Sequence, residues 1–301
     1  MKIGLIGLGR MGGNMTERLL NGGHSVVVTT RDKSKIDAAV EKGAIGVNSI
    51  EALVSELSAP RGVWIMLPAG DITESTIQQL MTLLDPGDTI IDGGNANYKD
   101  SERRAKYLSE AGFNFLDAGT SGGVWGLKNG YSIMVGGEPE VFARFEPLVK
   151  TLAPGPDRGY GLVGPAGAGH YAKMIHNGIE YGMMQALAEG FEILGKKREY
   201  EFDLHQVGEV WQHGSVIVSW LLDLAVRALE EDPDLSALEA YVEDSGEGRW
   251  TVQEAIDLDS PAEVLTLALL RRFRSRDESP FSDRMLAALR QQFGGHAVRS
   301  K

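Results

Sequence analysis

The sequence contains no cysteine, so this chain can form no disulfide, thiolate nucleophile or thiolate-bound metal site. Lys and Arg number 30 against 42 Asp and Glu, which gives a formal net charge of −12. This balance argues against a nucleic-acid partner, because binding to a phosphate backbone depends on clustered cations. No apolar run has membrane-spanning length, and the apolar start, Met1 to Ile6, is too short for a signal peptide. We therefore expect a cytoplasmic protein with neither a membrane nor a nucleic-acid partner.

The remaining composition is that of a globular protein, with 43% hydrophobic residues in a chain of 301. In the first half, short apolar runs alternate with amphipathic segments. The expected strands are Lys2 to Ile6, Ser25 to Thr29, Val63 to Leu67, Thr89 to Ile91, Phe113 to Leu116 and Tyr131 to Val135. This rhythm is typical of an α/β, Rossmann-like domain with a mostly parallel sheet and helical crossovers.

The second half has few strand-like runs and reads as helices. The longest are expected at Ala166 to Leu194, Ser215 to Glu231 and Pro261 to Arg274. Glycine and proline interrupt the chain at Gly164-Pro165, just before the first of these helices. The sequence therefore predicts a Rossmann domain over residues 1–163 and an all-α domain over residues 164–301.

Three glycines near the amino terminus follow the spacing Gly7-x-Gly9-x-x-Gly12, directly after an expected strand and before a helix expected from Arg10. The first permits a tight turn, the second lets backbone approach a pyrophosphate, and the third lets the helix pack on the strand. A purely structural turn is the alternative, but the helix amino terminus favours an anion and the βαβ context favours a nicotinamide dinucleotide. The residues expected to contact it are Gly7, Leu8, Gly9, Arg10, Met11 and Gly12.

The choice between the two nicotinamide cofactors depends on the end of the second strand, which reads Thr29-Thr30-Arg31-Asp32. An acidic residue there would bind the ribose hydroxyls and repel a 2′-phosphate. Arg31, beside the hydroxyl of Thr30, could instead pair with that phosphate and stack on the adenine. The pattern favours NADP, but Asp32 could still turn towards the ribose, which leaves NAD open.

Five polar residues between Gly169 and Gly182 are spaced to share one face of a helix. They are Lys173, His176, Asn177, Glu180 and Tyr181. Solvated faces usually carry several Lys and Glu, whereas here one of each is mixed with His, Asn and Tyr. A base and an acid on one face suit proton transfer next to a hydride acceptor. The competing interpretation is a solvated stripe with an i,i+4 pair between His176 and Glu180.

Motifs along essentially the whole chain resemble those of the decarboxylating 6-phosphogluconate dehydrogenases, in their short-chain form. In order, they are Gly7 to Gly12, Leu67 to Gly70, Asp92 to Asn95, Thr120 to Gly123, the helix around Lys173, Gly246 to Thr251 (GEGRWT) and Arg290 to His296 (RQQFGGH). The resemblance implies oxidative decarboxylation of 6-phosphogluconate to ribulose 5-phosphate, with reduction of NADP and no metal, as in the pentose phosphate pathway. It also implies a helical domain that binds substrate and forms a homodimer, with pairing into tetramers left open.

The resemblance assigns the chemistry to Lys173 and Glu180. Lys173 would take the proton of the third-carbon hydroxyl, and Glu180 would protonate the first carbon of the enediol that remains after carbon dioxide is lost. The residues implied to hold the sugar acid are Asn95, Ser121, Gly122, Gly123, His176, Asn177, Tyr181, Arg249, Thr251, Arg290 and His296. Leu67, Pro68, Ala69 and again Asn95 are added to the cofactor site. The turns at Asp92–Asn95 and Ser121–Gly123 could also be no more than tight turns.

One position departs from the family's pattern. In the segment Gly214 to Trp220, the family usually has a phosphate-binding arginine where this sequence has Val218. Either the retained cationic residues suffice, or another arginine such as Arg272 or Arg274 substitutes, or the substrate is a different sugar acid. We expect the first, because the other phosphate-binding residues are retained.

Two further functions are alternatives. A non-decarboxylating β-hydroxyacid dehydrogenase would share the glycine motif, the Ser-Gly-Gly turn and a lysine, but the two motifs of the second half argue against a small unphosphorylated substrate. A cofactor-sensing protein would need neither acid nor base. A metal site is not expected, since the six histidines show no ligand spacing beyond His205 and His213.

Overall fold

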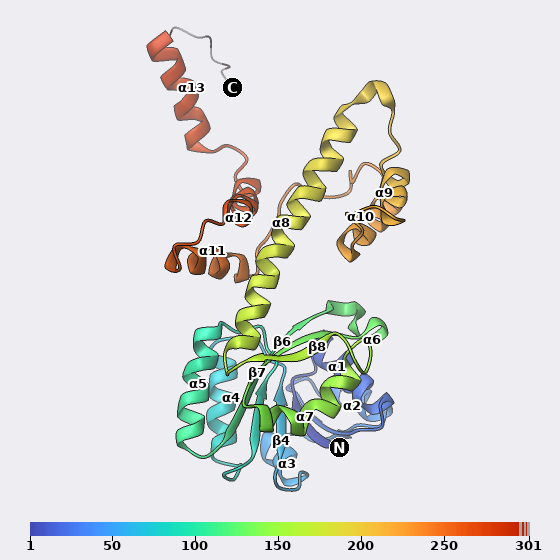
Figure 1. Cartoon of the computed structure of the whole chain (residues 1–301), viewed down its shortest axis with the longest axis vertical. Helices are drawn as coiled ribbons and strands as arrows, with labels where there is room; N and C mark the ends of the chain where they lie inside the picture. Colours follow the sequence, from blue (N-terminus) through green and yellow to red (C-terminus); the bar gives the residue numbers. More distant parts are fainter. Residues whose placement is uncertain (295–296, 298, 300–301) are drawn as a thin grey trace. The chain divides into compact units, whose positions relative to one another are not determined.

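The computed structural model describes residues 1–294, 297 and 299, and the chain divides into two compact units, residues 1–176 and 177–301 (Figure 1). A mostly parallel sheet with helices forms the first unit, and the described elements of the second are all helices, which confirms the expected fold class. The expected boundary after residue 163 stays a prediction. Helix α8, Ala168–Lys196, begins in the first unit and continues into the second. None of the described helices is both long enough and apolar enough to cross a membrane.

Eight strands form one sheet in the order β3-β2-β1-β4-β5-β6-β7-β8. They are Lys2–Ile6 (β1), Ser25–Thr29 (β2), Ile45–Gly46 (β3), Gly62–Ile65 (β4), Thr89–Asp92 (β5), Asn114–Ser121 (β6), Ser132–Gly137 (β7) and Tyr160–Gly164 (β8). All neighbours are parallel except β6 and β7, which are antiparallel. The sequence predicted six of the eight. Strand β3 has only two residues and β8 is only partly buried, so neither shows the apolar run of a buried strand.

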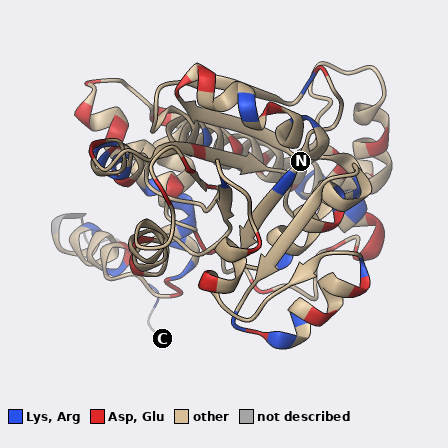
Figure 2. Cartoon of the chain, turned by 90° about the horizontal axis from the view of Figure 1, so that it is seen from below, with Lys and Arg blue, Asp and Glu red and all other residues tan. Residues whose placement is uncertain are grey.

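Helices cover both faces of this sheet (Figure 1). One face packs against α1 (Arg10–Asn21), α2 (Lys33–Glu41) and α7 (Pro139–Leu152), and the other against α3 (Ile50–Ser55), α4 (Asp71–Met81) and α5 (Tyr98–Glu110). Alternate residues of β1 supply the two cores, since Leu5 packs with the first group and Ile6 with the second. The strands are almost free of charged residues, whereas the helices carry both signs (Figure 2). After β6 come the short helices η1 (Gly123–Trp125) and α6 (Gly126–Asn129).

The strand order creates a switch point next to β1, because the chain leaves β1 towards β2 on one side and later returns to β4 on the other. In open α/β sheets, ligands bind outside the carboxyl ends of the strands at such a point. The segments that follow β1, β2, β4 and β5 are the ones to which the sequence assigns the cofactor.

The second unit contains the rest of α8, the short η2 (Arg198–Tyr200), α9 (Leu204–Gln212), α10 (Trp220–Glu231), α11 (Glu247–Asp257), α12 (Glu263–Ser275) and α13 (Phe281–Gly294). Its buried clusters are small, one around Phe191 and Leu222 and one around Tyr181 and Leu269. Helix α10 begins later than the predicted Ser215, because the hydroxyl of Ser219 accepts a hydrogen bond from the Leu222 amide and caps it.

Candidate active site

The turn between β1 and α1 has the geometry that a dinucleotide motif requires. Gly7 has a φ of 101°, and a Cβ there would collide with the carbonyl of Met66. A Cβ on Gly12 would collide with the carbonyl of Gly7, so this glycine lets α1 pack on the turn. A Cβ on Gly9 would meet no atom within 4 Å. Gly9 is also the N-cap of α1 and offers no capping side chain, so the helix amino terminus faces open space suited to an anion.

An open groove of about 510 Å³ lies beside this turn. Its lining includes Leu8 and Gly9 from the turn, Arg10 and Asn14 from α1, Lys35 from α2 and Lys42 just after α2. Lys42 pairs with Glu17 of α1 at 2.6 Å, so the groove carries both signs of charge. Three of the six predicted residues, Leu8, Gly9 and Arg10, thus line the groove.

The different surroundings of Gly9 and Gly12 make separable predictions. Gly9→Val should weaken NADP binding by about tenfold or more, because the side chain fills the space at the helix amino terminus, while the melting temperature stays near that of the wild type. Gly12→Val should instead destabilise the fold by about 1–3 kcal/mol through overpacking. Cofactor titration and thermal unfolding of both variants check this, and a large drop in melting temperature for Gly9→Val would contradict the assignment.

The segment after β2 contains the two charged residues, Arg31 and Asp32, that bear on the choice of cofactor. The Asp32 carboxylate accepts hydrogen bonds from the amide and hydroxyl of Ser34, at 3.0 and 2.7 Å, and caps α2. The Ser34 hydroxyl is the main reason why the pKa of Asp32 is lowered. Asp32 is thus engaged within its own helix, while Thr30 is half-buried and Arg31 is exposed.

The two loops that follow β4 and β5 lie against each other. The hydroxyl of Thr73, in the first turn of α4, donates to the carbonyl of Pro68 at 2.8 Å. A Cβ on Gly94 would be 2.6 Å from the carbonyl of Leu67. The loop with Leu67, Pro68 and Ala69 therefore approaches the loop that carries the exposed Asn95.

The start of α8 is fixed tightly to the sheet by a buried carboxylate. Asp117, in the middle of β6 and fully buried, accepts hydrogen bonds from the amides of Gly167 and His170 at 2.6 and 2.7 Å. The side chain of His170 lies 2.7 Å from the hydroxyl of Ser101 on α5. A carboxylate at a helix amino terminus is favoured by the helix dipole. The first turn of α8 thus has a fixed position relative to β6 and α5.

Close backbone approach fixes the next turn of α8, which carries Lys173. A Cβ on Gly119 of β6 would stand 2.5 Å from both the carbonyl of Gly169 and the Cβ of Lys173. Two residues after Gly119, β6 ends at Ser121. Gly122 and Gly123 follow it, and both have positive φ, 134° and 50°. The structure therefore brings Lys173 to the strand that leads into the predicted Ser-Gly-Gly turn.

All five residues of the predicted polar stripe lie in α8, as the sequence indicates. Tyr181 is nearly buried and packs within the second unit. Its hydroxyl accepts a hydrogen bond from the Ser245 amide at 3.2 Å, and a Cβ on Gly248 would lie 2.5 Å from its ring. The guanidinium of Arg272 stacks over the ring at 3.6 Å. Arg272, one of the two arginines considered as a substitute at Val218, is thus beside a predicted phosphate-binding residue.

The predicted phosphate residue Arg249 already has a carboxylate partner. Its Nε and Nη2 donate to Asp244 at 2.8 and 3.0 Å, and Arg276 donates to the same carboxylate at 2.7 Å. These arginines, Arg249 first, hold the pKa of Asp244 well below its usual range. Thr251 is buried in α11 and donates to the carbonyl of Glu247 at 2.9 Å.

Two further positions singled out from the sequence lie at the surface of the second unit, and a third is not described. Arg290 is exposed on α13, Val218 is about half-exposed before α10, and His296 lies outside the described residues. Arg274, the other candidate substitute, pairs with Asp283 at 2.8 Å instead. In the described residues no group of three or more His, Asp or Glu could hold a metal ion.

Comparisons with known proteins agree with this geometry. A family model described as the NAD binding domain of 6-phosphogluconate dehydrogenase matches residues 2–162, and one described as the C-terminal domain of 6-phosphogluconate dehydrogenase matches residues 169–300. The chain belongs to the 6-phosphogluconate dehydrogenase family. Its first unit is accordingly an NAD(P)-binding domain, and the family is that of NAD(P)-dependent decarboxylating dehydrogenases.

Two relatives show that the chain is of the short type. The YqeC protein of Bacillus subtilis is 44% identical over 301 residues, which is 100% of both chains. The NAD(+)-dependent, decarboxylating 6-phosphogluconate dehydrogenase of Haloferax volcanii is 42% identical over 302 residues, 100% of this chain and 99% of the relative.

A longer relative provides the structural comparison. The 6-phosphogluconate dehydrogenase of Plasmodium falciparum, solved in its apo form and with its cofactor NADP+ and its substrate 6-phosphogluconate, matches with a TM-score of 0.84 at 28% identity. The match covers 100% of this chain and 66% of that one. This chain therefore corresponds to about two thirds of the length of that relative.

Proposed function

We propose that this protein oxidises 6-phosphogluconate to ribulose 5-phosphate and carbon dioxide while NADP is reduced. The observation that carries the proposal is the placement of Lys173, which stands against Gly119 on β6 in a helix anchored by Asp117. This lysine lies against the carboxyl-terminal half of β6, and ligands of this architecture bind outside the carboxyl ends of the parallel strands.

The proposed chemistry begins with Lys173 as general base. It takes the proton from the third-carbon hydroxyl. A nicotinamide dinucleotide held by the turn at Gly7–Gly12 would supply the acceptor for the hydride of the same carbon. The product is a β-keto acid, so the electrons of the breaking carbon–carbon bond can move onto the new ketone oxygen. The Lys173 ammonium stabilises that oxygen, and Glu180, two turns further along α8, protonates the first carbon of the resulting enediol, which was the second carbon of the sugar acid.

The proposal includes a preference for NADP. The Asp32 carboxylate is engaged in capping α2, which supports Arg31 as the side chain that receives the 2′-phosphate. Relatives differ in this respect, since the Haloferax enzyme is NAD(+)-dependent and the Plasmodium enzyme was solved with NADP+.

Arg31→Gln should raise the Kd for NADP by about tenfold to a hundredfold, which is the loss of one charge-assisted contact, and leave NAD binding unchanged. Direct titration with both cofactors measures this. Arg158→Gln, an exposed arginine paired with Asp157, is the control. Equal losses for NAD and NADP would contradict the 2′-phosphate contact.

We also propose that Arg272 supplies the charge missing at Val218, together with Tyr181, Arg249 and Thr251. The expectation that the retained residues suffice stays a prediction; Arg272 is proposed in addition because it stacks on Tyr181 and donates to a carbonyl, that of Glu243, whereas Arg249 is paired with the Asp244 carboxylate. A guanidinium can remain on the aromatic ring while its edge binds a phosphate.

Arg272→Met is expected to raise the KM for 6-phosphogluconate by about tenfold to a hundredfold, because one charge-assisted contact is lost. Arg274→Met, two residues along the same helix, removes the pair with Asp283 and should leave KM unchanged. Steady-state kinetics at saturating NADP distinguish the two variants. An equal KM in both would show that the phosphate is bound elsewhere.

A paired assay tests the reaction itself. The wild type should reduce NADP with 6-phosphogluconate and release one carbon dioxide per NADPH, with little activity on gluconate. Reduction without carbon dioxide would favour a non-decarboxylating β-hydroxyacid dehydrogenase, and a preference for gluconate would favour a different sugar acid. Cofactor binding without any reduction would favour a sensor.

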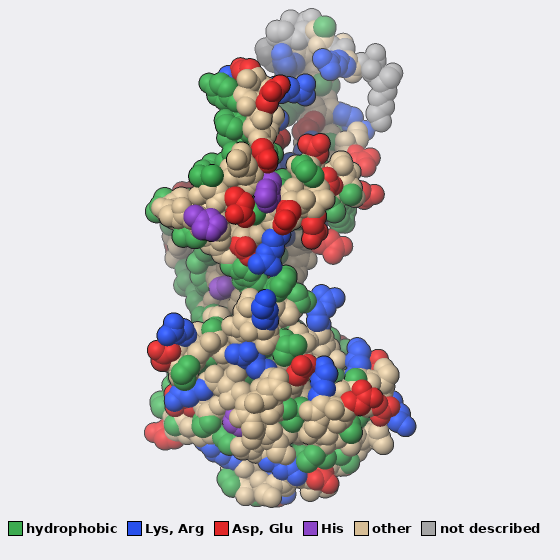
Figure 3. Space-filling model, turned by 90° about the vertical axis from the view of Figure 1, so that its right-hand side faces the viewer, with side chains coloured by type: hydrophobic (Ala, Val, Ile, Leu, Met, Phe, Trp, Pro, Cys, Tyr) green, Lys and Arg blue, Asp and Glu red, His purple; other side chains and the backbone are tan. Residues whose placement is uncertain are grey.

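The proposal extends to a homodimer, because the second unit leaves many large apolar side chains at its surface (Figure 3). Examples are Ile193, Val264, Leu267 and Leu286, each more than 60% exposed. Light scattering after size exclusion should give twice the chain mass of 32.6 kDa. A monomer would remove this part of the proposal.

A further inference from the structure

A buried carboxylate shapes the turn that carries Asn95. Asp92 ends β5 with no exposed surface, and its Oδ1 accepts a hydrogen bond from the Gly94 amide at 3.1 Å. Its Oδ2 accepts one from Nη1 of Arg104 at 3.0 Å. Both oxygens of Asp92 are therefore used inside the protein, one to hold the turn and the other to hold an arginine.

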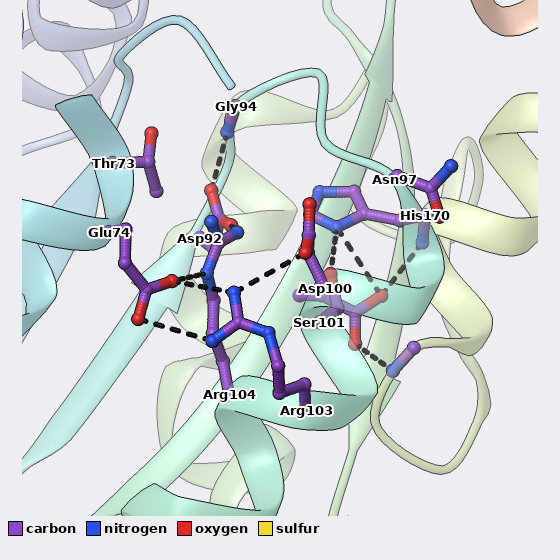
Figure 4. Close-up of polar contacts among 12 residues, drawn as sticks. Thr73, Glu74, Asp92, Gly94, Asn97, Asp100, Ser101, Arg103, Arg104 and His170 are labelled. Carbon is purple, nitrogen blue, oxygen red and sulfur yellow. Dashed lines mark hydrogen bonds and ion pairs between the residues drawn. The ribbon is translucent and has the colours of Figure 1, made fainter. Parts of the chain in front are cut away.

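Arg104 continues this chain of contacts to another helix. It lies on α5, is only 1% exposed, and its Nε donates to Oε2 of Glu74 on α4 at 3.0 Å (Figure 4). Arg103 and Tyr107 also bind Glu74. These donors, Arg103 first, lower the pKa of Glu74 to about 2, so this residue remains a carboxylate at neutral pH. The contacts thus form a continuous relay from Glu74 through Arg104 to Asp92.

The relay ends beside the cofactor loop. Thr73, the neighbour of Glu74 in the first turn of α4, donates to the carbonyl of Pro68. One turn of α4 is therefore linked to both loops, to Leu67–Gly70 through Thr73 and to Asp92–Asn95 through the relay. The two loops approach so closely that a Cβ on Gly94 would stand 2.6 Å from the Leu67 carbonyl, which leaves no room for a side chain between them.

We infer that Arg104 is a positioning residue for the reaction, which fixes the turn that presents Asn95 to the substrate relative to the loop that holds the cofactor. Burying the Arg104 guanidinium and the Asp92 carboxylate costs free energy, and apolar side chains of similar volume often stabilise a core as well. An arginine between two carboxylates fixes their relative orientation, because its planar guanidinium donates to both at once. Hydride transfer depends on the relative position of substrate and cofactor, since a misplacement of about 1 Å can lower the rate by about a hundredfold.

The inference rests on the proposed function and is tested with a pair of adjacent arginines. Arg104→Lys keeps the charge but loses the fork, and Arg103→Lys is the matched control, because Arg103 binds Glu74 without contacting Asp92 and is half-exposed. We expect Arg104→Lys to raise the KM for 6-phosphogluconate and lower kcat, each by about tenfold, with a smaller rise in the Kd for NADP because the cofactor loop is also loosened. The primary deuterium isotope effect with 3-deuterated substrate should rise, while Arg103→Lys remains like wild type.

A purely structural role predicts a different result. Arg104→Lys would then unfold more easily, but its folded fraction would keep the wild-type KM and isotope effect, and that outcome would overturn the inference. Should Arg104→Lys fail to fold, Glu74→Gln keeps the bond between Arg104 and Asp92 and weakens only the anchor on α4. It should shift KM in the same direction by a smaller factor, and an unchanged KM would again overturn the inference.

Hydrogen exchange separates this inference from the proposed function. If the wild type does not turn over 6-phosphogluconate, the proposed function fails, but the relay still predicts faster amide exchange in residues 66–70 and 92–95 of Arg104→Lys than of Arg103→Lys. Equal exchange in both variants would refute the relay, whatever the substrate. An active wild type with unchanged kinetics in Arg104→Lys would refute the inference alone.

Discussion

Replacing Lys173 with methionine is expected to lower kcat for 6-phosphogluconate oxidation by about a thousandfold to ten-thousandfold, the upper range for loss of a general base. Methionine keeps the length of the side chain and the helix propensity of α8. The KM values for cofactor and substrate should change much less than kcat, because the lysine acts mainly in the transition state. Initial rates of NADPH formation measure the effect.

Lys196→Met provides the control on the same helix. Lys196 lies at the end of α8, is 74% exposed and pairs with Glu192 at 2.6 Å, so its loss should leave kcat unchanged. Activity of Lys173→Met within about tenfold of the wild type would exclude Lys173 as the base.

The second large effect is expected at Gly119, where there is no room for a side chain between β6 and α8. Gly119→Val would push the backbone of Gly169 and the side chain of Lys173 away from the strand. We expect a loss of stability of about 1–3 kcal/mol from overpacking, and a fall in kcat of about a hundredfold in the protein that folds, because the base is displaced. Chemical denaturation and active-site titration measure the two separately.

Gly161→Val is the matched variant for this test. Gly161 lies in β8 of the same sheet, and a Cβ there meets no atom within 4 Å. Its stability and kcat should therefore stay close to those of the wild type. Wild-type kcat in Gly119→Val would show that the contact between strand and helix does not set the position of Lys173.

The features that sequence predicts best are those that depend on neighbours in the chain. The glycine turn, the end of β2 and the stripe on α8 each lie within about a dozen residues, so spacing alone brings their members together. The helix α8 was predicted for the same reason, because its periodic pattern lies within one continuous segment. Strand β3 went unpredicted because two residues form no periodic pattern.

The supporting contacts of the site join distant segments and were not predicted. Arg104 follows Arg103 in a polar helix, and nothing in the sequence tells which of the two is buried. Arg272 and Tyr181 are brought together by folding of the second unit alone. Asp117 did leave a signal, since a carboxylate inside the apolar run Phe115 to Ala118 must have a buried partner. That partner is the amino terminus of α8, which periodicity could not identify.

Helix α8 runs without interruption from Ala168 to Lys196, past both Lys173 and Glu180. Seven residues of α-helix correspond to a rise of about 10 Å and nearly two full turns, so the two groups keep a constant separation and point to the same side. The spacing of the proposed base and acid is therefore set by the number of residues between them in one helix. A single inserted residue between them would turn Glu180 by about 100° around the helix axis and remove it from the face of Lys173. An insertion or deletion within these seven residues would therefore abolish the proposed proton transfers, although surface loops tolerate such changes in length.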